Sequence, residues 1–117
     1  MSLDITLTVT KWESYNSGKT WTEQEVPVYE GNITHNLTRM AEACRLYEVM
    51  WRPEGLLAGD IIPSLEKGLD LLKSDPDKFK QYDSDNGWGK YKDFVPFVEE
   101  YLNTCKKYPQ AKIEVSR

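Results

Sequence analysis

Alternating apolar and polar residues predict a β-hairpin in the first quarter of the chain. Residues 4–11 alternate isoleucine, leucine and valine with threonine, which is the period of a half-buried strand rich in β-branched residues. Turn-forming residues 14–19 follow, and alternation resumes over residues 22–29. Because Pro27 cannot donate to a ladder, we expect the second strand to be an edge strand or to be irregular there.

From Leu37 the apolar spacing changes to three and four residues, which predicts one helix over residues 37–51. The helix should stop near Arg52, because Pro53 disfavours helical geometry in the residue before it. A continuous helix would separate Thr34, at its N-terminal end, from about residue 49 by about 22 Å, so its two ends could not both contact one small ligand. Its apolar face carries Leu37, Met40, Cys44, Tyr47 and Trp51.

Two further helix starts are marked by aspartate and proline. Asp60 is expected to cap a second helix, with Pro63 in the first turn, where a missing N–H does no harm. The inward residues of this helix are Ile62, Leu65, Leu69 and Leu72. Asp75 followed by Pro76 predicts a short helix that reaches about Tyr82.

The last helix is predicted from an apolar face and is followed by a third strand. Pro96 implies a late start near Asp93 or a kink. Residues 111–116 alternate again, with Ile113 and Val115 pointing inward. The helix face carries Tyr91, Phe94, Val98, Tyr101 and Cys105.

Three strands with apolar faces on one side and several amphipathic helices predict an α+β fold. We expect a small three-stranded, mainly antiparallel sheet with three to four helices packed on one face. The length of 117 residues suits a single domain over 1–117. Within it lie an N-terminal hairpin (4–29), a helical region (34–107) and a C-terminal strand (111–116).

Composition indicates a soluble globular protein, with 39% hydrophobic residues, 29% charged residues and a net charge of −4. Without a membrane-length apolar run or a signal-peptide layout, we expect a cytoplasmic protein that does not bind membranes. The 19 acidic and 15 basic residues show no clustered basic face, which argues against nucleic acid as a partner. Cys44 and Cys105 are expected as buried thiols, with a disulfide as the alternative if their helices face each other.

The first candidate site is the stretch GNITHNLT at residues 31–38, which contains the only histidine. Thr34 or Asn36 can cap the following helix, which is a purely structural interpretation. One capping oxygen suffices, yet Asn32 and His35 add further polar groups beside helix N–H groups that can meet an anion. Two interpretations therefore stay open: the stretch is only a helix cap, or it is a helix cap that also forms part of a binding site.

Two other clusters carry aromatic and polar residues together. Trp51 and Arg52 suit packing and a helix C-terminus, or stacking on a planar ligand and gripping a carboxylate or phosphate. Asn86, Trp88 and Tyr91 belong to a glycine-containing loop that is either a plain turn or a binding loop. No nucleophile setting or metal-ligand set accompanies them, so we expect no catalytic residues, no metal and no cofactor, and a non-enzymatic protein.

The chain resembles a group of small uncharacterised bacteriophage and prophage proteins. The shared stretches are NITHNLTRMAEA, YEVMWRPE, IIPSLEKGLDLLKSDPDKF, NGWGKY, FVEEYLNTC and a terminal IEVSR. The resemblance implies the cytoplasm of a bacterial host as the setting, supplies no activity, and suggests that the three clusters meet around one cleft.

Two functional hypotheses follow. The first is a phage-type non-enzymatic protein that binds a nucleotide-like or anionic small molecule. Its ligand-binding residues would be Asn32, His35, Asn36, Trp51, Arg52, Asn86, Trp88 and Tyr91. The alternative is a protein-interaction module that modulates a host or phage protein, with Trp and Arg as anchors. The sequence leaves the oligomeric state open.

Overall fold

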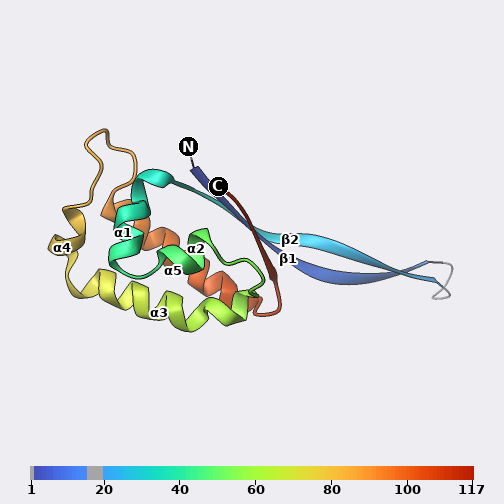
Figure 1. Cartoon of the computed structure of the whole chain (residues 1–117). Coiled ribbons are helices and arrows are strands. Elements are labelled where there is room, and N and C mark those ends of the chain that lie inside the picture. Colours follow the sequence, from blue (N-terminus) through green and yellow to red (C-terminus); the bar gives the residue numbers. More distant parts are fainter. Residues whose placement is uncertain (1, 16–19) are drawn as a thin grey trace.

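The computed structural model shows a helical body from which a long two-stranded arm projects (Figure 1). It describes residues 2–15 and 20–117. The molecule measures 59 × 27 × 21 Å, and its long dimension follows the arm. The predicted α+β class is confirmed, because a three-stranded antiparallel sheet of order β2-β1-β3 accompanies the helices.

The central strand β1 (Ser2–Tyr15) pairs with β2 (Thr20–Thr34) along its whole length. It pairs with β3 (Lys112–Ser116) only from Asp4 to Thr8. Both hairpin strands are longer than the alternation of residues 4–11 and 22–29 predicts. Of the predicted turn, residues 16–19 lie outside the described part of the chain.

The expectation that Pro27 marks an irregular edge strand is confirmed. Strand β2 lies at one edge of the sheet. Leu7 is opposite Tyr29 while Thr8 is opposite Pro27, so Val28 is the additional residue of a β-bulge. The bulge directly follows Pro27, as expected because proline has no N–H to donate to the ladder and is found at edges and bulges.

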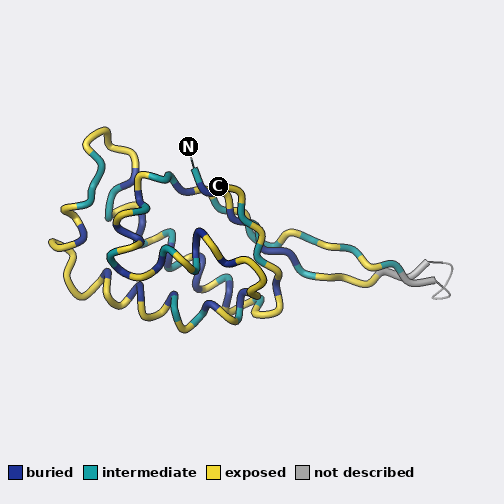
Figure 2. Tube along the Cα trace, viewed as in Figure 1, coloured by how far each residue is buried: buried dark blue, intermediate teal, exposed yellow. Residues whose placement is uncertain are grey.

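One face of the sheet is covered by the helices. Leu3, Ile5 and Leu7 point to that face and are fully buried, each contributing about 2 kcal/mol by leaving water. Tyr29 on β2 stacks on Tyr101 of α5 (Tyr91–Lys107) with ring centroids 5.5 Å apart. Figure 2 shows that buried residues concentrate in the body, whereas the arm is mostly exposed or half-buried.

The predicted single helix over residues 37–51 is divided into three pieces, so its predicted continuity is wrong. These are the 3₁₀ helix η1 (His35–Leu37), α1 (Thr38–Ala43) and α2 (Tyr47–Trp51). Arg45 adopts the left-handed conformation with φ of 66°. The Leu46 N–H donates to Ala41 O at 2.7 Å, and the Arg45 N–H donates to Glu42 O at 3.1 Å. This pattern is a Schellman motif, which ends α1.

Packing on α3 (Ala58–Ser74) explains why the helix ends there. Leu46 is fully buried and lies against Gly68, where a Cβ would come within 2.3 Å of Leu46 Cδ2. Residues 37–51 have no strong breaker of their own, so the contact with another helix overrides local helix propensity.

Helix α3 begins earlier than predicted, at Ala58. Asp60 is not the N-cap; it occupies the third helical position, and its carboxylate accepts the Leu57 N–H at 2.9 Å. The N–H groups of Ala58 and Gly59 donate to Ala111 O and Pro109 O at 2.9 and 2.8 Å. The carbonyl groups of the segment before β3 therefore accept the first N–H groups of α3, which have no partner within the helix.

The shifted start changes two details of α3. Pro63 lies inside the helix rather than in its first turn. Ile61 is fully buried while Ile62 is only half-buried, so the inward face is turned by one residue from the prediction at this point. Further along the helix the predicted inward residues are buried: Leu65, Leu69 and Leu72.

The two C-terminal helices follow the predicted signals closely. Helix α4 (Pro76–Lys80) is capped by Asp75, whose carboxylate accepts the Lys78 N–H at 3.2 Å, as predicted. Helix α5 (Tyr91–Lys107) begins at Tyr91 rather than near Asp93 and contains Pro96 within it. Strand β3 then places Ile113 and Val115 half-buried against the core, as predicted.

The two cysteines are free and fully buried, which confirms the prediction of buried thiols. Burial raises the pKa of Cys44 to about 11 and that of Cys105 to about 12. Both thiols are therefore neutral and act as small apolar groups in the core.

Substituting Arg45→Gly should raise the free energy of unfolding by about 1 kcal/mol, because glycine adopts the left-handed conformation without a steric penalty. Urea denaturation measures the change. The matched control is Arg39→Gly, within α1, which should lower the free energy of unfolding by about 1 kcal/mol. A loss of stability in Arg45→Gly would contradict the assignment of a strained turn.

Candidate functional site

The joint between β2 and η1 is built by a threonine cap. Thr34 Oγ1 accepts the Asn36 N–H at 3.2 Å, and Thr38 Oγ1 donates to His35 O at 2.9 Å. The capping function predicted for GNITHNLT is therefore confirmed, with Thr34 as the capping residue. One hydroxyl does this work, so the side chains of Asn32, His35 and Asn36 are not consumed as caps.

The glycine loop docks directly on this joint. Asn36 Nδ2 donates to Trp88 O at 3.1 Å. Gly89 has φ of 86°, and a Cβ there would lie 2.7 Å from Thr34 Cγ2 and 3.2 Å from Leu37 Cγ. The loop can approach this closely only because residue 89 has no side chain. Two of the three predicted clusters thus meet.

Hydrogen bonds within the loop leave the Trp88 ring outside. Asn86 Oδ1 accepts from Ser84 Oγ at 2.5 Å and from the Trp88 N–H at 2.9 Å. Hydrogen bonds fix the Trp88 backbone at both its N–H, which donates to Asn86, and its carbonyl, which accepts from Asn36. Trp88 itself is 71% exposed. An indole this exposed on an ordered turn offers a flat apolar surface to a ligand.

The imidazole of His35 is fixed by a hydrogen bond from the buried Trp51. Trp51 is 1% exposed, stacks on Tyr47 with centroids 5.6 Å apart, and donates from Nε1 to His35 Nδ1 at 3.0 Å. Because Nδ1 accepts this bond, the neutral imidazole carries its proton on Nε2. His35 therefore retains an N–H donor for a ligand, while its other nitrogen is already used.

A surface hollow of about 770 Å³ lies where these elements meet. Asn32 contributes from β2, with its Nδ2 donating to Ser2 Oγ at 2.9 Å and to Asp4 Oδ1 at 2.5 Å. Among the described residues no donor is bonded to the Asn32 amide oxygen, which can accept from a ligand. The lining residues are Ser2, Asn32, Thr34, His35, Asn36, Asn86 and Trp88.

Most of the predicted site residues are brought together. The hollow is lined by Asn32, His35, Asn36, Asn86 and Trp88. Trp51 does not line it, but supports His35 through the hydrogen bond described above. The predicted 22 Å separation does not apply, because the turn at Arg45 folds α2 back toward the start of η1.

Arg52 and Tyr91 do not line the hollow. Arg52 follows α2 and is exposed, and the neighbouring Tyr47 side chain raises the pKa of its guanidinium. Tyr91 is used for structure, because its hydroxyl donates to Leu72 O at 2.7 Å and its N–H donates to Asp83 Oδ1 at 2.7 Å. Neither side chain belongs to the lining set.

Sequence reasoning missed Ser2 as a lining residue. Ser2 is directly opposite Thr34 in the β1–β2 register, which brings the start of the chain beside the joint. Its position depends on the length of the hairpin and on the bulge at Val28, and the alternation pattern reveals neither. The only signal was Asp4 and Asn32, polar residues near the two open ends of the predicted hairpin.

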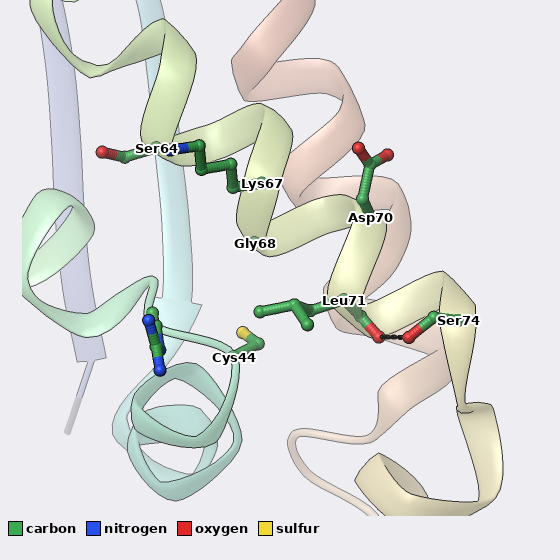
Figure 3. A pocket seen from close by; sticks show the side chains of 8 residues that line it. Cys44, Ser64, Lys67, Gly68, Asp70, Leu71 and Ser74 are labelled. Carbon is green, nitrogen blue, oxygen red and sulfur yellow. Dashed lines mark hydrogen bonds between the residues drawn. The ribbon is translucent and has the colours of Figure 1, made fainter.

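A second hollow of about 540 Å³ lies between the turn after α1 and helix α3 (Figure 3). Cys44 and Leu71 point toward each other across its floor, and Leu71 is 41% exposed. The Ser74 hydroxyl donates to Leu71 O at 2.7 Å, so it is used within the helix. No residue of the predicted site lies in this groove, and its polar groups do not converge on one point.

The first hollow is uncharged. Among the described residues that line it, none is lysine, arginine, aspartate or glutamate. The part of the chain that the structure describes also holds no cluster of three histidine, cysteine or acidic residues suited to a metal ion. The hollow offers amide, hydroxyl and imidazole groups beside one indole.

Comparison with protein-family models, with curated proteins and with solved structures gives no match. Residues 2–15 and 20–117 contain no helix long and apolar enough to cross a membrane. Function must therefore be argued from the geometry of the hollow.

Substituting Gly89→Ala should disrupt the joint. Alanine would meet Thr34 and Leu37 and would also be strained at positive φ, so we expect a loss of at least about 2 kcal/mol in the free energy of unfolding. The matched control is Gly87→Ala, with φ of 80° and open space around it, which should lose only about 1 kcal/mol. Equal losses in urea denaturation would show that the close approach at Gly89 does not matter.

Substituting His35→Ala should lower the free energy of unfolding by about 1–3 kcal/mol, because the buried Trp51 N–H loses its acceptor. In a Trp51→Phe background the same substitution should have a much smaller effect, since no donor is left unpaired. A double-mutant cycle by urea denaturation measures this coupling. Identical effects in both backgrounds would be incompatible with the bond as a stabilising interaction.

Proposed function

We propose that the protein is a non-enzymatic binding protein that takes up a planar, uncharged, polar small molecule of nucleobase or nucleoside type. The ligand would lie in the hollow beside Trp88. The observation that carries this proposal is the 71% exposed indole of Trp88, held at a hollow lined by polar side chains.

The lining groups suit the edge of such a ligand. His35 offers a donor at Nε2, while Asn32 and Asn36 each keep an amide oxygen whose nitrogen partner is already bonded elsewhere. A planar molecule stacked on Trp88 could therefore donate to amide oxygens and accept from the imidazole. Such a flat apolar surface with a few polar groups is the usual composition of a small-molecule site.

The absence of charge in the lining favours a neutral ligand over a phosphate. Anion sites commonly use arginine, lysine or a helix N-terminus. Neither arginine nor lysine is among the described residues that line the hollow. The helix that begins beside it, η1, spans only His35–Leu37 and is too short to act as an anion site. The anionic part of the expectation from sequence thus gains no support, whereas the nucleobase-like part does.

Binding rather than catalysis suits the state of His35. A general base needs a free lone pair within reach of the proton that it removes. The Nδ1 lone pair of His35 accepts the Trp51 N–H at 3.0 Å and so is not available to a substrate. The remaining lining groups are amides, the indole and the hydroxyls of Ser2 and Thr34. Among the described residues no base is hydrogen-bonded to either hydroxyl, and the Asp4 carboxylate nearby accepts from the Asn32 amide.

We propose the cytoplasm of a bacterial host as the setting. The support for this is the resemblance of the sequence to bacteriophage and prophage proteins. A nucleoside-type ligand would be present there.

The second candidate is a protein-interaction module that modulates a host or phage protein. The observation in its favour is the exposure of Trp88 and of Trp12, which is 58% exposed on the arm. Trp51 cannot act as an anchor in this role, because it is 1% exposed.

A ligand panel tests the first proposal. Nucleosides should raise the thermal midpoint of the protein and bind in isothermal titration calorimetry, and their 5′-monophosphates should bind no more tightly. Trp88→Ala should weaken binding by about 5- to 150-fold, because stacking on an aromatic ring contributes about 1–3 kcal/mol per base.

Trp12→Ala is the matched control, since it removes an exposed tryptophan ten residues along β1 from the lining residue Ser2, about 33 Å at the rise of a strand. It should leave ligand binding unchanged. If no nucleoside binds, and a host protein is retained from lysate in a manner that depends on Trp88, the interaction module is the better account.

A further inference from the structure

The central strand β1 has an unpaired edge along the arm. Strand β3 pairs with β1 only from Asp4 to Thr8 and begins at Lys112, opposite Thr8. Strand β1 continues to Tyr15. Among the described strands, nothing pairs with the β3 side of residues 9–15, so seven positions of β1 are open there.

The two edges of the arm, one along β2 and one along residues 9–15 of β1, differ. Along the edge of β2, Pro27 lacks an N–H, and the bulge at Val28 interrupts the regular pairing register. Both features hinder the addition of another strand. Residues 9–15 of β1 contain no proline, glycine or bulge, and pair regularly with β2. This edge is thus the better template for another strand.

We propose that residues 9–15 of β1 pair with the same residues of a second copy of this chain. The pairing would be antiparallel about a two-fold axis. Because the open segment runs from residue 9 to residue 15, the only symmetric register that fills it is centred on Trp12. The two arms then form a four-stranded ribbon of order β2-β1-β1-β2 with the helical bodies at opposite ends.

The register places complementary residues opposite each other. Lys11 falls opposite Glu13 of the second copy, and symmetry repeats this pair on the other side of the axis. Opposite charges directly across a strand pair are favourable, whereas like charges are unfavourable. Val9 falls opposite Tyr15, and Trp12 falls opposite its own copy. An edge lysine normally prevents pairing of strands, but here the second copy supplies its counter-charge.

The exposure of the arm supports the same conclusion. A two-stranded ribbon without a covered face is marginal in water. Trp12 is 58% exposed, and the neighbouring Thr10 and Lys11 are exposed as well. Pairing through β1 would add a ladder of backbone hydrogen bonds and bring two indoles together. A two-fold contact also closes on itself, so it does not lead to fibres.

Charge exchange at positions 11 and 13 tests both the partner and the register. In sedimentation equilibrium the wild-type chain should be a dimer that dissociates on dilution. Lys11→Glu and Glu13→Lys should each weaken the dimer by about tenfold or more, because two attractive pairs become repulsive. The double variant Lys11→Glu/Glu13→Lys should restore it. A mixture of the two single variants should form a heterodimer.

Lys92→Glu, an exposed substitution on α5 with the same change of charge, should leave dimerisation unchanged. Circular dichroism confirms that each variant is folded. The proposal is overturned if the wild-type chain remains a monomer at the highest concentration reached. It is equally overturned if the folded double variant associates as weakly as the single variants, since pairing in this register requires the restored charges.

Discussion

The left-handed turn at Arg45 is the constraint on which the arrangement of the body depends. If residues 37–51 formed one straight helix, Trp51 would lie about 24 Å along the axis from His35. The Schellman motif instead turns the chain back, so that Trp51 Nε1 reaches His35 Nδ1 at 3.0 Å. Leu46, placed by the same turn, fills the space over Gly68 of α3. The left-handed turn at Arg45 thus links the start of the helical region, through His35 and Trp51, to α3, through Leu46 and Gly68.

This coupling determines the chemistry of the hollow. Trp51 fixes the imidazole of His35 in one tautomer, and the glycine loop fixes Asn36 through the carbonyl of Trp88. The polar groups of the lining that would face a proposed ligand are those that the two joints do not use: one N–H and several amide or hydroxyl oxygens. Because the lining carries no charge, selectivity would come from the geometry of these donors and acceptors, and affinity from the indole of Trp88.

Local signals in the sequence predicted the elements whose causes are local. Alternation over β1 and β3, the Asp75 cap of α4 and the edge position of β2 at Pro27 all depend on neighbouring residues. The break at Arg45 could not be predicted, because it is favoured by contact with Gly68, more than twenty positions away in the chain. The early start of α3 likewise depends on carbonyl groups of the segment before β3.

The candidate site was predictable to the same extent. Asn32, His35 and Asn36 stood out because they exceed what one helix cap requires, and Trp88 because a large aromatic residue stood between two glycines. Their meeting depends on Gly89, whose missing side chain allows the loop to lie on Thr34. Arg52 and Tyr91 fulfilled the same sequence criteria but are placed elsewhere by the turn at Arg45 and by the Leu72 carbonyl.

Strand β1 serves two different environments because the bulge separates them. Val26 and Tyr29 are three residues apart, and the additional residue Val28 lets both point to the helix-facing side. On the body side of the bulge, that face is buried against α5 through Tyr29 and Tyr101. Beyond it, the helices no longer cover the ribbon, and β3 no longer pairs with its edge. The core therefore stabilises only one half of the hairpin, and the other half needs a second strand from outside the chain to acquire an equivalent set of partners.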